Sequence, residues 1–160
     1  HFGDALSHYK DALDCATSAN DPLAVGSAQV GCGTVLMAQG RLQQAEENLQ
    51  GACEAFEEAE HTEGLWHAAA NLGDLLRLEG RLSEALTTLV PHVEAARMAG
   101  SPYRYSALVL NYAEVLVELY RLGEARERLD ELQHLGIAQT HPIMSAGLAL
   151  LHGRLELISG

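Results

Sequence analysis

One short pattern recurs along this chain with a period of 40 residues. Gly40-Arg41-Leu42 returns as Gly80-Arg81-Leu82 and, with its glycine replaced, as Tyr120-Arg121-Leu122. Each copy is followed by an alanine and then by an apolar residue four positions later; the pairs are Ala45 and Leu49, Ala85 and Leu89, and Ala125 and Leu129. A fixed period of about 20–50 residues is typical of repeat proteins, whose units bury their apolar faces only against neighbouring units.

A second landmark shares this period. One repeat position holds Thr62 in one copy and a proline in the others, namely Pro22, Pro102 and Pro142. Proline suits the first position of a helix because the N–H there has no partner, and Asp21 and Ser101 stand at the N-cap before two of these prolines. The sequence therefore predicts that the first helix of each repeat begins near 22, 62, 102 or 142. The second helix of each repeat begins after the Gly-Arg-Leu pattern or its degraded copy, near 42, 82 and 122. The expected helices span 2–18, 22–39, 42–59, 62–79, 82–98, 102–119, 122–135 and 142–159.

The second helices are amphipathic. In the copy over 42–59, one apolar stripe has the helical spacing of three or four residues: Leu42, Ala45, Leu49, Cys53 and Phe56. The intervening glutamates Glu46, Glu47, Glu54, Glu57 and Glu58 lie mostly off that stripe. They form either an acidic docking face or an ordinary solvated outer surface.

The pattern resembles the tetratricopeptide repeat, with its Leu-Gly pair on the first helix and Ala-x3-Phe on the second. Leu72-Gly73 and Cys32-Gly33 match the pair. A small residue on the first helix precedes the alanine of the second by twelve positions in each complete copy: Gly33 and Ala45, Gly73 and Ala85, Ala113 and Ala125. The period exceeds the usual length of about 34 residues, and the family tryptophan is replaced by Gln29, Ala69, Val109 and Ala149. The resemblance implies an all-α fold, a right-handed superhelical solenoid of antiparallel helix pairs with about eight helices.

The expected organisation is one repeat array over 1–160. It comprises a partial repeat over 1–20, repeats over 21–60, 61–100 and 101–140, and a partial repeat over 141–160. Such long repeats resemble those of large multidomain bacterial regulators, so we expect the array to be a fragment of a longer protein. The last helix carries Leu148, Leu151, Leu155 and Ile158 where natural arrays place a polar cap, which also allows pairing with another copy.

In the tetratricopeptide family the first helices line a concave groove that holds the partner. Carried over by position, the groove of this chain begins with Ser27, Val30 and Thr34 in the first copy. The principal binding candidates follow in the later copies: His67, Asn71, Asp74, Arg77, Asn111, Glu114 and Arg154. An asparagine amide both donates and accepts hydrogen bonds and suits a peptide backbone, and an arginine can hold a carboxylate. The groove has no lysine, so it departs from the family's clamp for a carboxyl terminus.

The chain is strongly acidic, with a formal net charge of −12. Phosphate backbones and anionic membrane surfaces would repel it, so we expect no direct contact with nucleic acid or membrane. Protein or peptide partners fit better. The three cysteines are odd in number and include no Cys-x-x-Cys pair, which favours a reducing, cytoplasmic location.

The chemistry-bearing residues form no recognisable catalytic or metal-binding motif. The sequence has no Gly-x-Gly-x-x-Gly, phosphate loop, Gly-x-Ser-x-Gly or His-Glu-x-x-His. His61 and His67 are spaced poorly for one helix face, and Cys32 and Cys53 fall at core positions, where cysteine behaves as a small hydrophobe. We expect no cofactor and no metal. Pro91 falls inside a second helix and is expected to kink or interrupt it.

The sequence thus predicts a non-catalytic module for protein–protein interaction that binds a peptide, a helix or a neighbouring domain in its groove. The setting expected from the resemblance is a bacterial signalling or transcription regulator. The alternative is a self-association element that uses the terminal helices.

Overall fold

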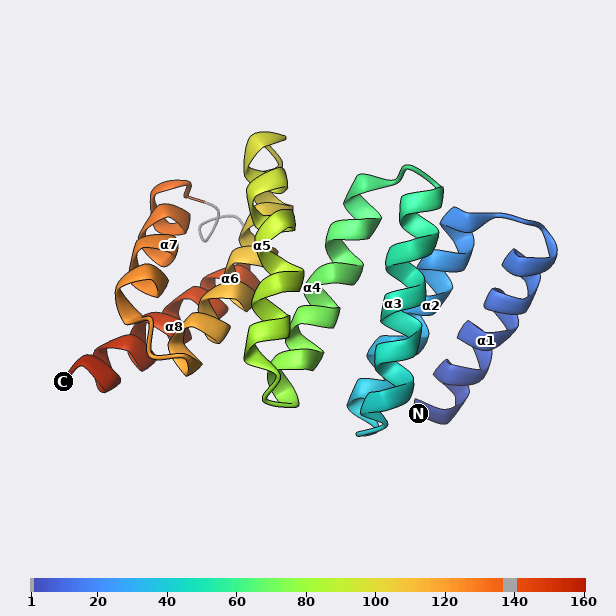
Figure 1. Cartoon of the computed structure of the whole chain (residues 1–160), viewed down its shortest axis with the longest axis horizontal. Coiled ribbons are helices and arrows are strands. Elements are labelled where there is room, and N and C mark those ends of the chain that lie inside the picture. Colours follow the sequence, from blue (N-terminus) through green and yellow to red (C-terminus); the bar gives the residue numbers. More distant parts are fainter. Residues whose placement is uncertain (1, 137–140) are drawn as a thin grey trace. The chain divides into compact units, whose positions relative to one another are not determined.

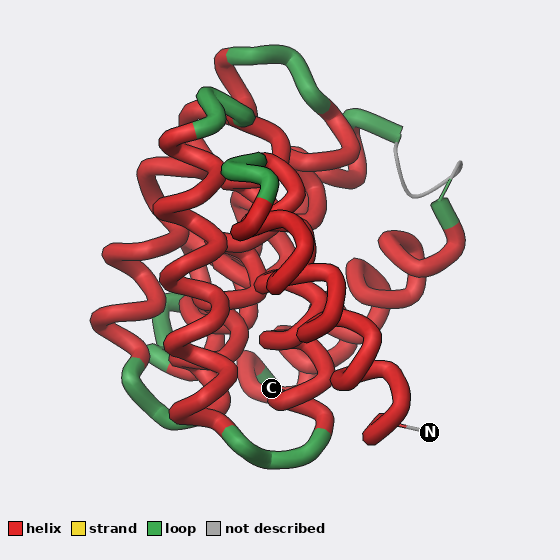
Figure 2. The backbone as a smooth tube through the Cα atoms, turned by 90° about the vertical axis from the view of Figure 1, so that its right-hand side faces the viewer, coloured by secondary structure: helices red, strands yellow, loops and turns green. Residues whose placement is uncertain are grey.

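The chain folds entirely into helices in the part that the computed structural model describes, residues 2–136 and 141–160 (Figures 1 and 2). The helices are α1 (Phe2–Ser18), α2 (Pro22–Ala38), α3 (Leu42–Glu58), α4 (Thr62–Leu78), α5 (Leu82–Met98), α6 (Pro102–Glu118), α7 (Leu122–His134) and α8 (Pro142–Ser159). All the predicted bounds are confirmed to within one residue, and with them the all-α repeat class. The repeat boundary expected at 140 lies outside the described residues.

The helices form two compact units, His1–Leu75 and Leu76–Gly160, divided within α4. In the first unit, α2 packs against both α1 and α3. In the second, α6 packs against α5, α7 and α8. Consecutive helices therefore pack on each other within each unit, as a helical repeat requires. The single continuous array and its superhelical sense stay predictions.

Each of the first six helices ends in the same kind of joint. The joint contains one residue with left-handed backbone: Asn20, Gly40, Glu60, Gly80, Gly100 or Tyr120, with φ between 51 and 75°. The next residue donates its N–H to a carbonyl five positions back, for example from Arg41 to Leu36 and from Arg121 to Leu116, both at 2.9 Å. This arrangement satisfies carbonyls that the end of a helix leaves unpaired. The recurrent glycines at 40 and 80 are explained by this backbone geometry.

The recurrent arginine after the joint binds the first turn of the following helix. Arg81 pairs with Glu84 at 2.7 Å, and Arg121 pairs with Glu124 at 2.6 Å. Hydrogen bonds from these arginines lower the pKa values of Glu84 and Glu124. The arginine of the repeated pattern is therefore a local feature of the joint rather than a ligand-binding residue.

The first helices begin with different caps. The Asp21 carboxylate accepts a hydrogen bond from the N–H of Ala24 at 3.0 Å, as the sequence predicted. Ser101 also stands at the N-cap of α6, as the sequence predicted, but its side chain makes no capping hydrogen bond. At the start of α4, His61 takes this role and its Nδ1 accepts from the N–H of Gly64 at 3.0 Å. An imidazole acceptor at this position is not one of the usual capping groups, so the sequence pattern missed it.

The small residues twelve positions apart bring α2 and α3 close together. A Cβ placed on Gly33 would lie 2.7 Å from Cγ of Leu49 and 3.4 Å from the carbonyl oxygen of Ala45. Gly33 is buried, and Ala45 and Leu49 are fully buried. The equivalent residues of the next copy, Gly73 and Ala85, are also both buried. Close approach of the two backbones is thus why this position stays small.

Two expectations about later helices need correction. α5 continues through Pro91, whose side chain is exposed, so the proline does not interrupt the helix. The expected kink stays a prediction. In α8, three of the leucines expected on an uncovered terminal face are buried: Leu148, Leu151 and Leu155. These leucines belong to the core of the second unit, and a different face of α8 is exposed.

Candidate functional site

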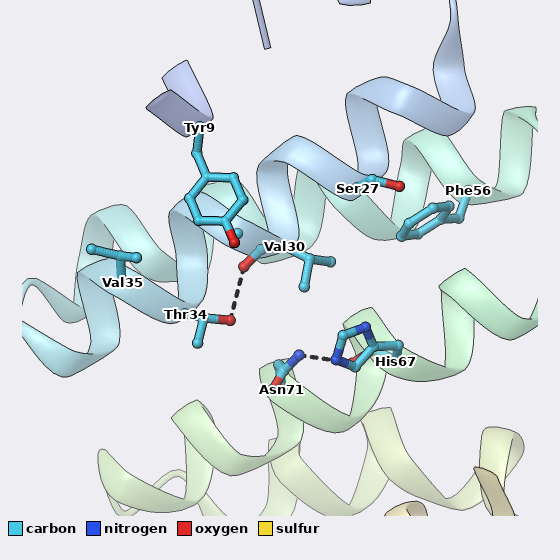
Figure 3. Close-up of a pocket in the computed structure, with 9 residues that line it drawn as sticks. Tyr9, Ser27, Val30, Thr34, Val35, Phe56, His67 and Asn71 are labelled. Carbon is cyan, nitrogen blue, oxygen red and sulfur yellow. Dashed lines mark hydrogen bonds between the residues drawn. The ribbon is translucent and has the colours of Figure 1, made fainter. Parts of the chain in front are cut away.

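The first unit contains an open pocket of about 440 Å³. It is lined by residues from four helices: Tyr9, Ser27, Val30, Gly31, Thr34, Val35, Phe56, His67 and Asn71 (Figure 3). Most come from the first helices α2 and α4, with Tyr9 from α1 and Phe56 from α3. Five of them were predicted groove residues, namely Ser27, Val30, Thr34, His67 and Asn71. The structure therefore brings together the candidates of two successive repeats.

Tyr9 forms an aromatic wall of this pocket by lying on the backbone of α2. A Cβ on Gly31 would come within 2.3 Å of the Tyr9 ring, so only glycine leaves room for the ring in this position. The tyrosine remains 41% exposed. It is the kind of side chain that offers both an apolar surface and a polar tip to a ligand.

Phe56 supplies the apolar base of the pocket. Its ring is 4% exposed and lies between two glycines: a Cβ on Gly26 or on Gly64 would come 2.9 or 2.5 Å from ring carbons. The His61 ring packs against it with the centroids 5.7 Å apart. Val30 joins Phe56 in one hydrophobic cluster with Ala52 and Ala68. The base is thus rigid, because neighbouring helices hold the ring on several sides.

The polar side chains of the pocket are held by their own helices. Ser27 donates to the carbonyl of Leu23 and Thr34 to that of Val30, both at 2.9 Å. The Asn71 amide donates to the carbonyl of His67 at 3.1 Å (Figure 3). A hydroxyl that donates in this way still accepts, and an amide has a second N–H and a carbonyl oxygen. The hydroxyls of Ser27 and Thr34 can therefore accept hydrogen bonds from a ligand, and the Asn71 amide can both donate and accept them.

The second unit brings other predicted candidates into an ion-pair network across three first helices. Arg77 of α4 contacts Glu114 at 3.0 Å and Glu118 at 2.8 Å, both on α6. Arg154 of α8 approaches the same Glu118 at 3.8 Å. Arg77 is the most buried member, with its side chain 16% exposed. Two carboxylates already offset the charge of Arg77, so a ligand carboxylate would have to compete with them.

The remaining predicted residues, Asp74 and Asn111, are not among those that line the pocket. Asp74 and Asn111 are both half-buried on first helices. His67 and Asn71 belong to the first unit, whereas Arg77, Glu114 and Arg154 belong to the second. The structure thus describes His67 and Asn71 in the pocket of the first unit, and Arg77, Glu114 and Arg154 in the ion-pair network of the second.

Sequence reasoning missed Tyr9, Gly31, Val35 and Phe56 at the pocket and Glu118 in the network. The resemblance points only to positions on first helices, so aromatic side chains entering from second helices were not considered. A usable signal existed for Tyr9, because it shares its repeat position with Leu49 and is larger.

Cys32 and Cys53 lack the features of a reactive thiol. Cys32 is 1% exposed, and burial raises its pKa. Burial, together with the nearby charges of Glu57 and Glu54, raises the pKa of Cys53 to about 11. A thiol with so high a pKa is almost entirely protonated at neutral pH and is a poor nucleophile.

Two absences hold for residues 2–136 and 141–160, the described part of the chain. No group of three or more histidine, cysteine, aspartate or glutamate side chains lies close enough there to hold a metal ion. No helix among these residues combines the length and apolar character needed to cross a membrane.

Comparison with known proteins does not assign the chain to a family. No protein-family model matches the sequence, and no curated protein matches it significantly.

Proposed function

We propose that this chain is a non-catalytic protein-interaction module of the tetratricopeptide type, and that the pocket of the first unit anchors a peptide or helix of its partner. The observation that carries the proposal is the pairing of a rigid apolar base with an aromatic wall and a row of polar side chains. Phe56 and Val30 form the base, Tyr9 the wall, and Asn71 the principal polar group.

The dimensions of the pocket support a peptide segment as the ligand. Its volume of about 440 Å³ lies within the range of about 300–1,000 Å³ typical of ligand pockets. The base suits an apolar side chain, whose burial contributes about 25 cal/mol per Å². The amide of Asn71 suits the backbone beside that side chain, because it can donate to a carbonyl and accept from an N–H.

The hydrogen bonds of the pocket argue against a serine or threonine nucleophile there. A hydroxyl nucleophile needs an adjacent base to accept its proton. The hydroxyls of Ser27 and Thr34 instead donate to backbone carbonyls of their own helix.

The net charge of the chain limits which partner segments it can bind. A net charge of −12 favours a neutral or basic segment and opposes an acidic one. The proposed setting is a cytoplasmic signalling or transcription regulator of bacteria, from the resemblance of the repeats.

The test is a peptide library screened against the 160-residue chain, followed by titration of the best binder. Asn71→Ala should weaken binding by about two- to tenfold, because a lost hydrogen bond contributes ~0.5–1.5 kcal/mol. Asn48→Ala is a matched control, since the Asn48 amide makes the same local bond, to the carbonyl of Gln44 at 2.8 Å, but lies outside the pocket.

Equal loss of affinity in both asparagine variants would contradict the proposal. So would binding that survives Asn71→Ala but disappears on changing the exposed Glu54 and Glu58, because that result assigns the partner to the acidic outer surface.

A further inference from the structure

The negative charge of the chain is concentrated in its first unit. His1–Leu75 has twelve aspartate and glutamate residues but only two lysines or arginines, Lys10 and Arg41, so its formal net charge is −10. Leu76–Gly160 has ten acidic residues and eight arginines, and its formal net charge is −2. The open pocket therefore belongs to the unit that attracts cationic ligands more strongly.

The accessible face of α4 places two of these carboxylates in line with the pocket. His67 and Asn71 line the pocket from α4 (Figure 3). Glu63 lies four residues before His67, and Asp74 lies three residues after Asn71. Residues spaced by three or four share one face of a helix. Glu63 is exposed and Asp74 half-buried, whereas most residues between them on the other faces of α4 are buried. A ligand that lies along this face meets a carboxylate on each side of the pocket.

The pocket itself offers an apolar anchor point between those charges. None of the described residues that line it is an aspartate, glutamate, lysine or arginine. Its base is apolar, with Phe56 4% and Val30 7% exposed. Lys10 is the basic residue nearest to the lining in the sequence, and it follows Tyr9 on α1. The carboxylates are on α4 instead, so a basic segment is expected to lie along α4.

On the basis of the function proposed above, we propose that the partner segment is basic: an apolar side chain enters the pocket, and a lysine or arginine on each side of it binds Glu63 or Asp74. A lysine or arginine suits these positions, because its aliphatic stem can lie on the protein while its charged end reaches the carboxylate.

The geometry of α4 sets the spacing of this segment. A helix rises by about 1.5 Å per residue, so Glu63 and Asp74 lie about 9 Å and about 8 Å along the axis from the point midway between His67 and Asn71. An extended segment advances by about 3.3 Å per residue. The basic residues should therefore stand two or three positions from the apolar one. Because a basic residue is expected on both sides, either chain direction of the segment fits.

The experiment selects short peptides with a fixed central leucine and randomised flanks on the 160-residue chain. Lysine and arginine should be enriched two or three positions from the leucine. The best binder is then titrated at low salt against Glu63→Gln and Asp74→Asn. Each variant should weaken binding by about 1.5- to 5-fold, the effect of losing one exposed ion pair. Both effects should shrink at high salt, because salt screens exposed charges.

The matched control is the double variant Glu54→Gln with Glu58→Gln. It removes two negative charges from the same unit, at exposed positions of α3 that do not line the pocket. Its affinity for the binder should stay near that of wild type, whereas Glu63→Gln with Asp74→Asn should lower the affinity. Thermal unfolding checks that each variant remains folded.

The outcomes separate this proposal from the function on which it rests. Binders without an excess of lysine or arginine overturn the basic segment, and so do equal affinities of the two double variants. Either result leaves a peptide-binding pocket in place if Asn71→Ala still weakens binding. A selection that yields no binder overturns the proposed function and the basic segment together.

Discussion

Leu49 occupies the space beside Gly33, so that a Cβ on the glycine would lie 2.7 Å from the leucine Cγ. Gly33→Ala should therefore destabilise the fold, although alanine is the better helix former by about 1 kcal/mol. Overpacking of this kind costs ~1–3 kcal/mol. Urea denaturation of the variant measures the difference, and a stability equal to or above wild type would show that α3 can move aside.

Gly153→Ala is the matched control because it changes the same repeat position in α8. Nothing lies within 4 Å of the added Cβ. The variant should gain ~0.5–1 kcal/mol from the lower backbone entropy of its unfolded chain. Measurement at low protein concentration separates this gain from any association. Opposite signs for the two substitutions are the expected result.

The joint at Tyr120 offers a second test of backbone geometry. Tyr120 has a left-handed backbone with φ of 57° and is 77% exposed, so replacing it loses little packing. A non-glycine residue in this region costs ~1–2 kcal/mol, part of which Tyr120→Gly should recover. Gly80→Ala makes the reverse change at a joint with φ of 75° and should destabilise. Thermal unfolding that moves in the same direction for both would contradict the assignment of strain to this backbone region.

Phe56 is expected to be a major contributor to the stability of the first unit. It is 4% exposed between Gly26 and Gly64, and removing such a ring leaves a cavity. Phe56→Ala should cost ~3–5 kcal/mol. Phe2→Ala removes the same side chain at a site that is 59% exposed, and its effect should stay within ~0.5 kcal/mol. Similar losses for both phenylalanines would show that Phe56 does not hold the helices together.

Alkaline pH should destabilise the fold through Tyr105 and Cys53. Burial, with the neighbouring Glu131 adding to it, raises the pKa of Tyr105 from 10.0 to about 12. Burial raises that of Cys53 from 9.0 to about 11. Both groups ionise more readily in the unfolded chain, so the folded state binds more protons and loses stability as the pH rises from about 9 to 12. Each unit of pKa difference corresponds to about 1.4 kcal/mol.

Tyr105→Phe removes one of these titrations and should flatten the fall in stability between about pH 10 and 12. Urea denaturation at a series of pH values measures it. An unchanged slope would mean that Tyr105 ionises as easily in the folded state as in the unfolded one.

The sequence predicts the helices well because independent local signals agree at each boundary. Pro22 marks the start of a helix, Gly40 marks the end of one, and both recur with the same period. The local signals and the tertiary packing therefore favour the same helix bounds. The joints at Asn20, Glu60 and Tyr120 carry no glycine, and there only the period located the helix ends.

The candidate site was harder to predict because it depends on contacts between helices. Positional analogy identified His67 and Asn71 on one first helix, since a shared repeat position implies a shared face. It did not indicate that Tyr9 enters the pocket, because that depends on the absence of a side chain at Gly31. Nor did it reveal that Arg77 is paired with Glu118, because ion pairs between helices leave no periodic pattern in the sequence.

The six joints from Asn20 to Tyr120 have the same length, and each has one residue with left-handed backbone at the same position. The sequence pattern, in contrast, repeats only every second helix. The backbone thus has a period of 20 residues and the side-chain pattern one of 40. Duplication or loss of a 40-residue segment would preserve the joints, and it would also preserve the alternation of first and second helices. A change of 20 residues would preserve the joints but place two first helices or two second helices in succession, with seams that do not match. Lineages of this protein should therefore vary in length by whole pairs of helices.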